Sequence, residues 1–81
     1  MQEIYEYLEE YHFHGSFEDG FKGYNGLEHI TITHDNDNGC YGIIVLDGRS
    51  TTIMDIEVEE SQLVFVLREI YHRRFFYRAH C

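Results

Sequence analysis

One stretch decides the fold of this 81-residue chain: Cys40-Tyr41-Gly42-Ile43-Ile44-Val45-Leu46-Asp47-Gly48. Residues 40–46 have the length and composition of a buried strand, and Asp-Gly is a strong hairpin signal. Residues 49–58 alternate between apolar and polar side chains, as expected of the returning strand. A two-residue turn pairs Leu46 with Arg49 and Ile43 with Thr52, and this register gathers apolar side chains on one face.

A third strand precedes this hairpin. His-Ile-Thr-Ile-Thr-His at 29–34 alternates with a period of two, and residues 35–39 are a run of turn formers. These segments predict a three-stranded antiparallel meander. Its second face carries Ile44 and Leu46, so we expect that face to need cover or a partner.

The N-terminal segment predicts a helix of about twelve residues. Ile4, Leu8 and Tyr11 form one apolar stripe, glutamates occupy the other sides, and Gly15 is the expected C-terminal stop.

The last segment, residues 62–78, has two interpretations. Leu63-Val64-Phe65-Val66-Leu67 has the composition of a strand, but the apolar stripe through Ile70 and Tyr77 and the absence of turn signals favour a helix capped by Ser61. The sequence therefore predicts one α+β domain over residues 1–81: helix, three-stranded meander, helix. The alternative makes the last segment a fourth strand.

Residues 15–26 combine four glycines with three aromatic side chains. The glycines predict a loop, because they interrupt regular structure. Phe17, Phe21 and Tyr24 either pin this loop onto the core or form an exposed contact patch.

Charge is the most informative feature of the composition. Six Lys+Arg stand against fifteen Asp+Glu, for a formal net charge of −9. The acids concentrate in residues 1–67, whereas residues 68–81 hold four arginines against Glu69. Nucleic acid repels such a body, because affinity for it comes mainly from Lys and Arg. We therefore expect no direct nucleic-acid binding.

Known catalytic and metal-binding patterns are absent from the sequence. No Cys-x-x-Cys or His-x-x-x-His spacing indicates a metal site, and residues 35–46 lack the glycine and glutamate positions of a calcium loop. Cys40 with His34 or His29 has no orienting carboxylate at a recognisable spacing. We expect neither an enzyme nor a cofactor.

Compartment is predicted from the same composition. Two cysteines, Cys40 and Cys81, do not make the disulfide framework of a small secreted domain, and no apolar stretch is long enough to span a membrane. We expect a cytoplasmic protein of a bacterial host cell.

The chain resembles, in size, charge and element order, small acidic α+β proteins of bacteriophages and mobile elements that inhibit nucleic-acid-handling enzymes. Anti-CRISPR and anti-restriction DNA mimics are of this class. The resemblance rests on no shared motif, so it transfers no functional residue. It implies a non-enzymatic inhibitor that binds the basic, nucleic-acid-binding surface of a partner such as a CRISPR effector or restriction nuclease.

Ten residues are the sequence-based candidates for this contact. The acidic ones are Glu6, Glu9, Glu10, Asp35, Asp37, Asp55 and Glu57, and the aromatic anchors are Phe21, Tyr24 and Tyr41.

Two alternatives remain open from the sequence. A homo-oligomeric accessory protein, such as a homodimer, would pair its basic last segment with the acidic body of another copy and bury the apolar second face of its sheet there. A histidine-tuned pH response would follow from the six histidines.

Overall fold

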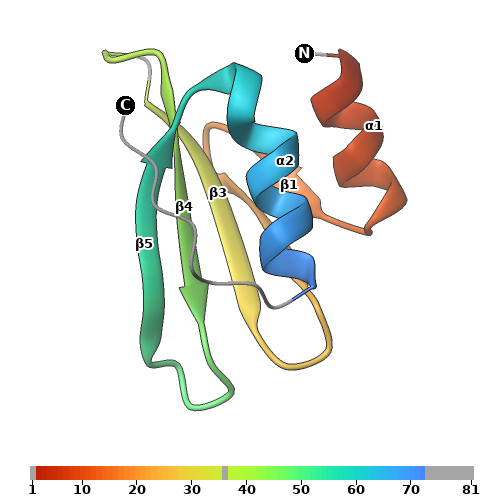
Figure 1. Ribbon diagram of the computed structural model, residues 1–81, viewed down its shortest axis with the longest axis vertical. Helices are drawn as coiled ribbons and strands as arrows, with labels where there is room; N and C mark the ends of the chain where they lie inside the picture. Colours follow the sequence, from red (N-terminus) through yellow and green to blue (C-terminus); the bar gives the residue numbers. More distant parts are fainter. Residues whose placement is uncertain (1, 36, 73–81) are drawn as a thin grey trace.

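Two helices lie on one face of a five-stranded antiparallel sheet in the computed structural model, which describes residues 2–35 and 37–72 (Figure 1). In chain order the elements are α1 (Gln2–Glu10), β1 (His14–Ser16), β2 (Gly20–Tyr24), β3 (His29–Asp35), β4 (Cys40–Leu46), β5 (Thr52–Val58) and α2 (Glu60–Tyr71). The sheet order β1-β2-β3-β4-β5 pairs every strand with the next one along the chain. The predicted α+β class is confirmed.

The core fills the space between the helices and the sheet. Its fully buried side chains include Leu8, Ile30, Ile32, Tyr41, Ile43, Val45, Val58, Leu63, Leu67 and Ile70. Because successive side chains of a strand point to opposite faces, the residues between these point away from the helices. A Cβ on Gly42 would lie 3.0 Å from Thr33 Oγ1, which places both residues on this second face.

We call this second side of the sheet the open face. In the part of the chain that the structure describes, both helices lie on the other side (Figure 1). The open face carries Lys22, Tyr24, His29, Thr31, Thr33, Ile44, Leu46, Thr52, Asp55 and Glu57.

The prediction of a glycine loop over residues 15–26 is wrong, since this segment forms β1 and β2 and raises the strand number from three to five. Gly15 and Gly23 allow close approach of neighbouring groups within these strands. A Cβ on Gly23 would lie 2.6 Å from ring carbons of Phe13, so this strand position accepts the ring only because it has no side chain. Phe17 and Phe21 do pack against the core, as the pinned-loop interpretation expected.

The predicted β4–β5 register is also wrong, although its assignment of Met54 and Ile56 to the core side holds; Thr52, beyond the bulge, lies on the open face. Ile43 pairs with Ile56, and Leu46 pairs with Thr52 next to a bulge. The loop is longer than two residues because the Asp47 carboxylate accepts backbone N–H groups from Arg49 and Thr51, at 2.8 and 2.9 Å. The strand slides by an even number of residues, so the apolar side chains stay on the core side.

The helices differ from the prediction at their ends. Helix α1 stops at Glu10, and Gly15 lies inside β1. The last segment is a helix, which excludes the fourth-strand alternative for residues 60–71. Its N-cap is Glu59, without a side-chain hydrogen bond, rather than Ser61. The predicted continuation to residue 78 lies outside the described residues.

Cys40 is buried at the start of β4 and is disulfide-bonded. The other cysteine of the sequence, Cys81, lies outside the described residues. The disulfide bond was not expected from the cysteine content, whereas the cytoplasmic location stays a prediction.

Candidate functional site

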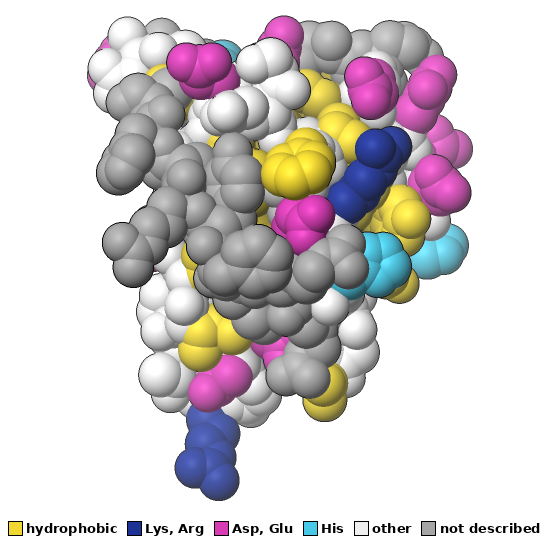
Figure 2. All heavy atoms as spheres, in the orientation of Figure 1, with side chains coloured by type: hydrophobic (Ala, Val, Ile, Leu, Met, Phe, Trp, Pro, Cys, Tyr) yellow, Lys and Arg dark blue, Asp and Glu magenta, His cyan; other side chains and the backbone are white. Residues whose placement is uncertain are grey.

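Helix α1 has an apolar side and an acidic side. Ile4, Tyr7 and Leu8 are buried in the core. The opposite side exposes four glutamates, which we call the acidic helix face: Glu3, Glu6, Glu9 and Glu10. Figure 2 shows acidic side chains gathered along the edge of the molecule where α1 lies. Three of the predicted site residues, Glu6, Glu9 and Glu10, thus lie together.

The spacing of these carboxylates approaches that of phosphates. A rise of about 1.5 Å per residue puts Glu3 and Glu10 about 10.5 Å apart along the helix axis. Four charges over this length give about one per 3.5 Å, close to the roughly 3.4 Å per phosphate along one DNA strand. The acidic helix face therefore presents a negative charge density similar to that of a single strand.

Three of these four acids lower the stability of their own helix, whereas Glu3 lies in the first turn, where the helix dipole favours an acid. Glu6 and Glu10 are four residues apart, and such like-charge pairs destabilise helices by roughly 0.2–0.5 kcal/mol each. The last turn of α1 has no basic residue, so Glu9 and Glu10 sit at the negative end of the helix dipole. Helix stability therefore does not explain why the acids are here.

Asp35 and Asp37 lie apart from α1, in the connection between β3 and β4. The Asp35 carboxylate accepts the backbone N–H of Asp37 at 3.0 Å and the Asn38 side-chain amide at 2.9 Å. Asp35 is half-buried, so its first role is to hold this turn, whereas Asp37 is exposed.

Asp55 and Glu57 are exposed on β5, but they belong to the open face. The sheet separates them from the helices (Figure 1). The seven predicted acids therefore do not form one surface, because a single flat partner surface cannot contact both sides of the sheet at once.

The three predicted aromatic anchors have different environments. Tyr24 is 54% exposed, Phe21 is half-buried against the core, and Tyr41 is fully buried. Tyr41 therefore cannot serve as a surface anchor. Burial, with a hydrogen bond to Glu60, raises the pKa of the Tyr41 hydroxyl to about 12.

Sequence reasoning missed Tyr5, which is 48% exposed beside the acidic helix face. Its ring centroid lies 5.7 Å from that of Phe17 and 6.3 Å from that of Phe21. The available signal was its helical position, since Tyr5 falls outside the apolar stripe of Ile4, Leu8 and Tyr11.

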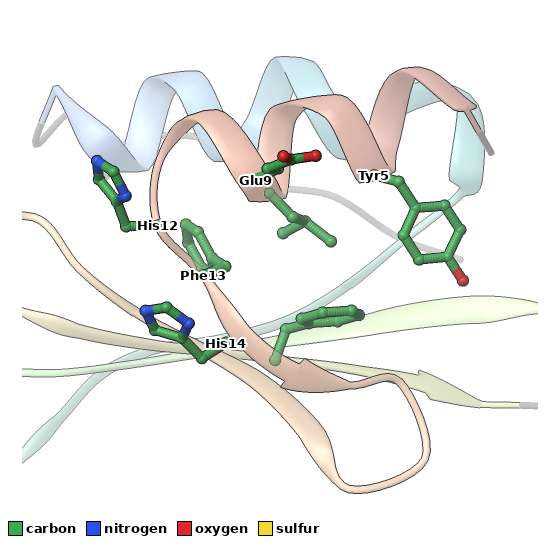
Figure 3. Close-up of a pocket in the computed structure, with 7 residues that line it drawn as sticks. Tyr5, Glu9, His12, Phe13 and His14 are labelled. Carbon is green, nitrogen blue, oxygen red and sulfur yellow. The ribbon is translucent and has the colours of Figure 1, made fainter.

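A groove of about 420 Å³ lies between α1 and the β1–β2 hairpin (Figure 3). Leu8, Phe13 and Phe21 supply apolar lining. Figure 3 shows Tyr5 at one end, His12 and His14 at the other, and Glu9 on the helix above. The groove suits a side chain with an apolar stem and a positive end, because apolar surface and a carboxylate lie side by side.

His12 closes α1 in a conformation that normally favours glycine. Its φ is 61°, its N–H bonds to the Glu9 carbonyl at 3.2 Å, and the Phe13 N–H bonds to the Leu8 carbonyl at 2.8 Å. This is the hydrogen-bond pattern of a Schellman motif with histidine at the left-handed position.

His12→Gly is expected to raise the free energy of unfolding by about 0.5–1 kcal/mol, because the left-handed conformation costs glycine little. Urea denaturation of both proteins measures this difference. A loss of stability instead would show that the imidazole makes contacts that outweigh its backbone strain.

The histidines do not form one cluster. His12 and His14 line the groove, His29 lies on the open face, His34 stacks 4.6 Å from Tyr41, and His80 lies outside the described residues. Within residues 2–35 and 37–72, no group of three His, Cys, Asp or Glu side chains is placed to hold a metal ion. The pH response stays a prediction.

Comparison with known proteins gives no match to a family model, a curated protein or a solved structure. Among the described residues, neither helix is long and apolar enough to cross a membrane.

Proposed function

We propose that this protein is a non-enzymatic inhibitor that occludes the nucleic-acid-binding surface of a partner, such as a CRISPR effector or a restriction nuclease. The observation that carries the proposal is the acidic helix face: four exposed glutamates with about the mean charge density of a DNA strand, of which Glu6, Glu9 and Glu10 destabilise their helix. A basic surface built for phosphates attracts such an array electrostatically.

The groove beside this face supplies a place for an arginine of the partner. Nucleic-acid-binding surfaces are rich in arginine, whose apolar stem can lie on the half-buried ring of Phe21 while its guanidinium reaches Glu9. The exposed ring of Tyr5 adds a face for cation–π contact. The contact thus combines charge with a desolvated anchor.

Charge reversal of the acidic helix face is expected to weaken partner capture on the order of tenfold or more, since close charge pairs at interfaces contribute at least about 1.5 kcal/mol each. The test compares wild type with Glu6→Lys/Glu10→Lys as immobilised baits in nuclease-treated bacterial lysate. Proteins eluted by a salt step are identified by mass spectrometry, and duplex DNA is then added to the recovered complex as a competitor.

The matched control is Asp37→Lys/Glu59→Lys, at two exposed acids outside α1. Each pair of substitutions changes the formal net charge from −9 to −5. We expect a nucleic-acid-handling protein that is retained by wild type and control, lost with the α1 variant and displaced by DNA. Equal losses of partner capture with both variants would show that capture depends on net charge alone. A partner that DNA does not displace would contradict occlusion of a nucleic-acid-binding surface.

A further inference from the structure

The open face exposes apolar side chains as well as charges. Tyr24 is 54% exposed and Ile44 is 37% exposed, and Ile53 at the adjacent bulge is 43% exposed. These are three of the six large hydrophobic side chains exposed in the described residues. Covering a sheet face of this kind removes apolar surface from water and therefore lowers the free energy.

The charges on the open face are arranged by the register. One row crosses strands β2 to β5 and reads Lys22, Thr31, Ile44 and Asp55. The row is therefore basic at β2 and acidic at β5. With strands about 4.8 Å apart, Lys22 and Asp55 lie roughly 14 Å from each other, too far to pair within one chain.

Lys22 and Asp55 are nevertheless placed symmetrically. Strand β2 lies one strand beyond β3, and strand β5 lies one strand beyond β4. A twofold axis that runs parallel to the strands, midway between β3 and β4, therefore exchanges these positions between two stacked sheets. Lys22 of each copy then faces Asp55 of the other, and Thr31 faces Ile44.

The neighbouring row obeys the same symmetry. Tyr24 in β2 and Thr52 in β5 both lie in the row of His29 and Leu46. The same axis lays the exposed Tyr24 ring over Thr52 and the bulge of the second copy. The Lys22–Asp55 pairs and the burial of Tyr24 therefore both favour the same arrangement of the two copies.

We propose that the open face binds a second copy of this chain, face to face, in a twofold dimer held by two Lys22–Asp55 pairs. Two such faces bury on the order of 1,000 Å² in total, which is the size of a weak or transient interface. Both α1 helices stay on the outside, so the dimer does not depend on the inhibitor function.

A charge-swap experiment tests this arrangement by sedimentation velocity across the micromolar concentration range. Lys22→Glu and Asp55→Lys each create two like-charge contacts and are expected to weaken dimerisation about tenfold or more. The double variant Lys22→Glu/Asp55→Lys restores opposite charges at both contacts, so it should dimerise nearly as well as wild type.

Two matched controls separate the pair from net charge. Arg49→Glu changes the charge as Lys22→Glu does, in the β4–β5 turn, and Glu6→Lys matches Asp55→Lys on α1. Both controls should dimerise like wild type. A wild-type protein that stays monomeric, or a double variant that remains as weak as the single ones, would overturn the proposal. Partner capture by monomeric Lys22→Glu is measured separately, so failure of either proposal is recognised independently.

Discussion

Gly23→Ala will lower the free energy of unfolding by about 2–3 kcal/mol, because the new methyl group occupies the space of the Phe13 ring. A Cβ at this position would lie 2.6–2.7 Å from three ring carbons of Phe13. The ring cannot move away easily, since Phe13 is only 7% exposed and its backbone N–H is bonded to the Leu8 carbonyl. For a chain of this length, total stability is roughly 4–12 kcal/mol.

Thermal denaturation followed by circular dichroism measures this effect, and we expect Tm to fall by roughly 10–20 °C. Gly48→Ala is the control, because a Cβ there meets nothing within 4 Å. Phe13→Ala alone should cost about 3–5 kcal/mol through its cavity. Adding Gly23→Ala to Phe13→Ala should then cost little more, since the clash has been removed. Additive losses would show that Phe13 is not the group that opposes a side chain at Gly23.

The second large effect is a loss of stability in alkaline solution that originates at Tyr41. The Tyr41 hydroxyl donates a hydrogen bond to Glu60 Oε1 at 3.0 Å inside the folded protein. Burial and this carboxylate raise the pKa of Tyr41 to about 12, whereas an unfolded tyrosine ionises near pH 10. The unfolded chain therefore loses the proton first as pH rises, and ionisation pulls the equilibrium towards unfolding.

The stability that follows from the raised pKa of Tyr41 is fully present below pH 10 and is lost as pH rises through about 12. This loss amounts to about 2–3 kcal/mol in the free energy of unfolding. Denaturant unfolding of wild type and Tyr41→Phe at several pH values measures it as a difference. At neutral pH, Tyr41→Phe should be less stable by about 1 kcal/mol, the loss of one hydrogen bond. The two stability curves should cross between pH 10 and 12, because only wild type loses the contribution of Tyr41 and this loss exceeds its advantage at neutral pH.

Burial also raises the pKa of Tyr7, so wild type and Tyr41→Phe should share a remaining alkaline loss. Tyr24→Phe, which removes an exposed hydroxyl, is the control for loss of a phenol. A constant difference between wild type and Tyr41→Phe across this pH range would contradict the assignment to Tyr41.

Part of the acidic site can be predicted from the local periodicity of the sequence. The helical period places Glu6, Glu9 and Glu10 on the exposed side of α1, and this part of the candidate surface follows from the sequence. The period of two likewise places Asp55 and Glu57 on one side of β5. Neither period tells on which side of the sheet a helix docks, so the separation of the two acidic groups could not be predicted.

The remaining site residues depend on long-range contacts. Tyr41 shares its strand face with Ile43 and Val45, but it is completely buried in the folded protein, where it contacts Phe17 and Glu60 from other parts of the chain. The contact of Tyr5 with Phe21 and the groove beside it form because α1 lies against the β1–β2 hairpin.

The sequence by itself determined the helices, strands β3 to β5 and the apolar face of the sheet, because periods of 3.6 and 2 are local and survive a register slide by an even number of residues. The tertiary structure alone decided β1, β2 and the register at the Asp47 loop. A three-residue strand is not stable without its neighbours, and a glycine reads as a break until the ring that needs its space is known. It also decided the charge pattern of the open face, since Lys22 and Asp55 share a row only through pairings across four strands.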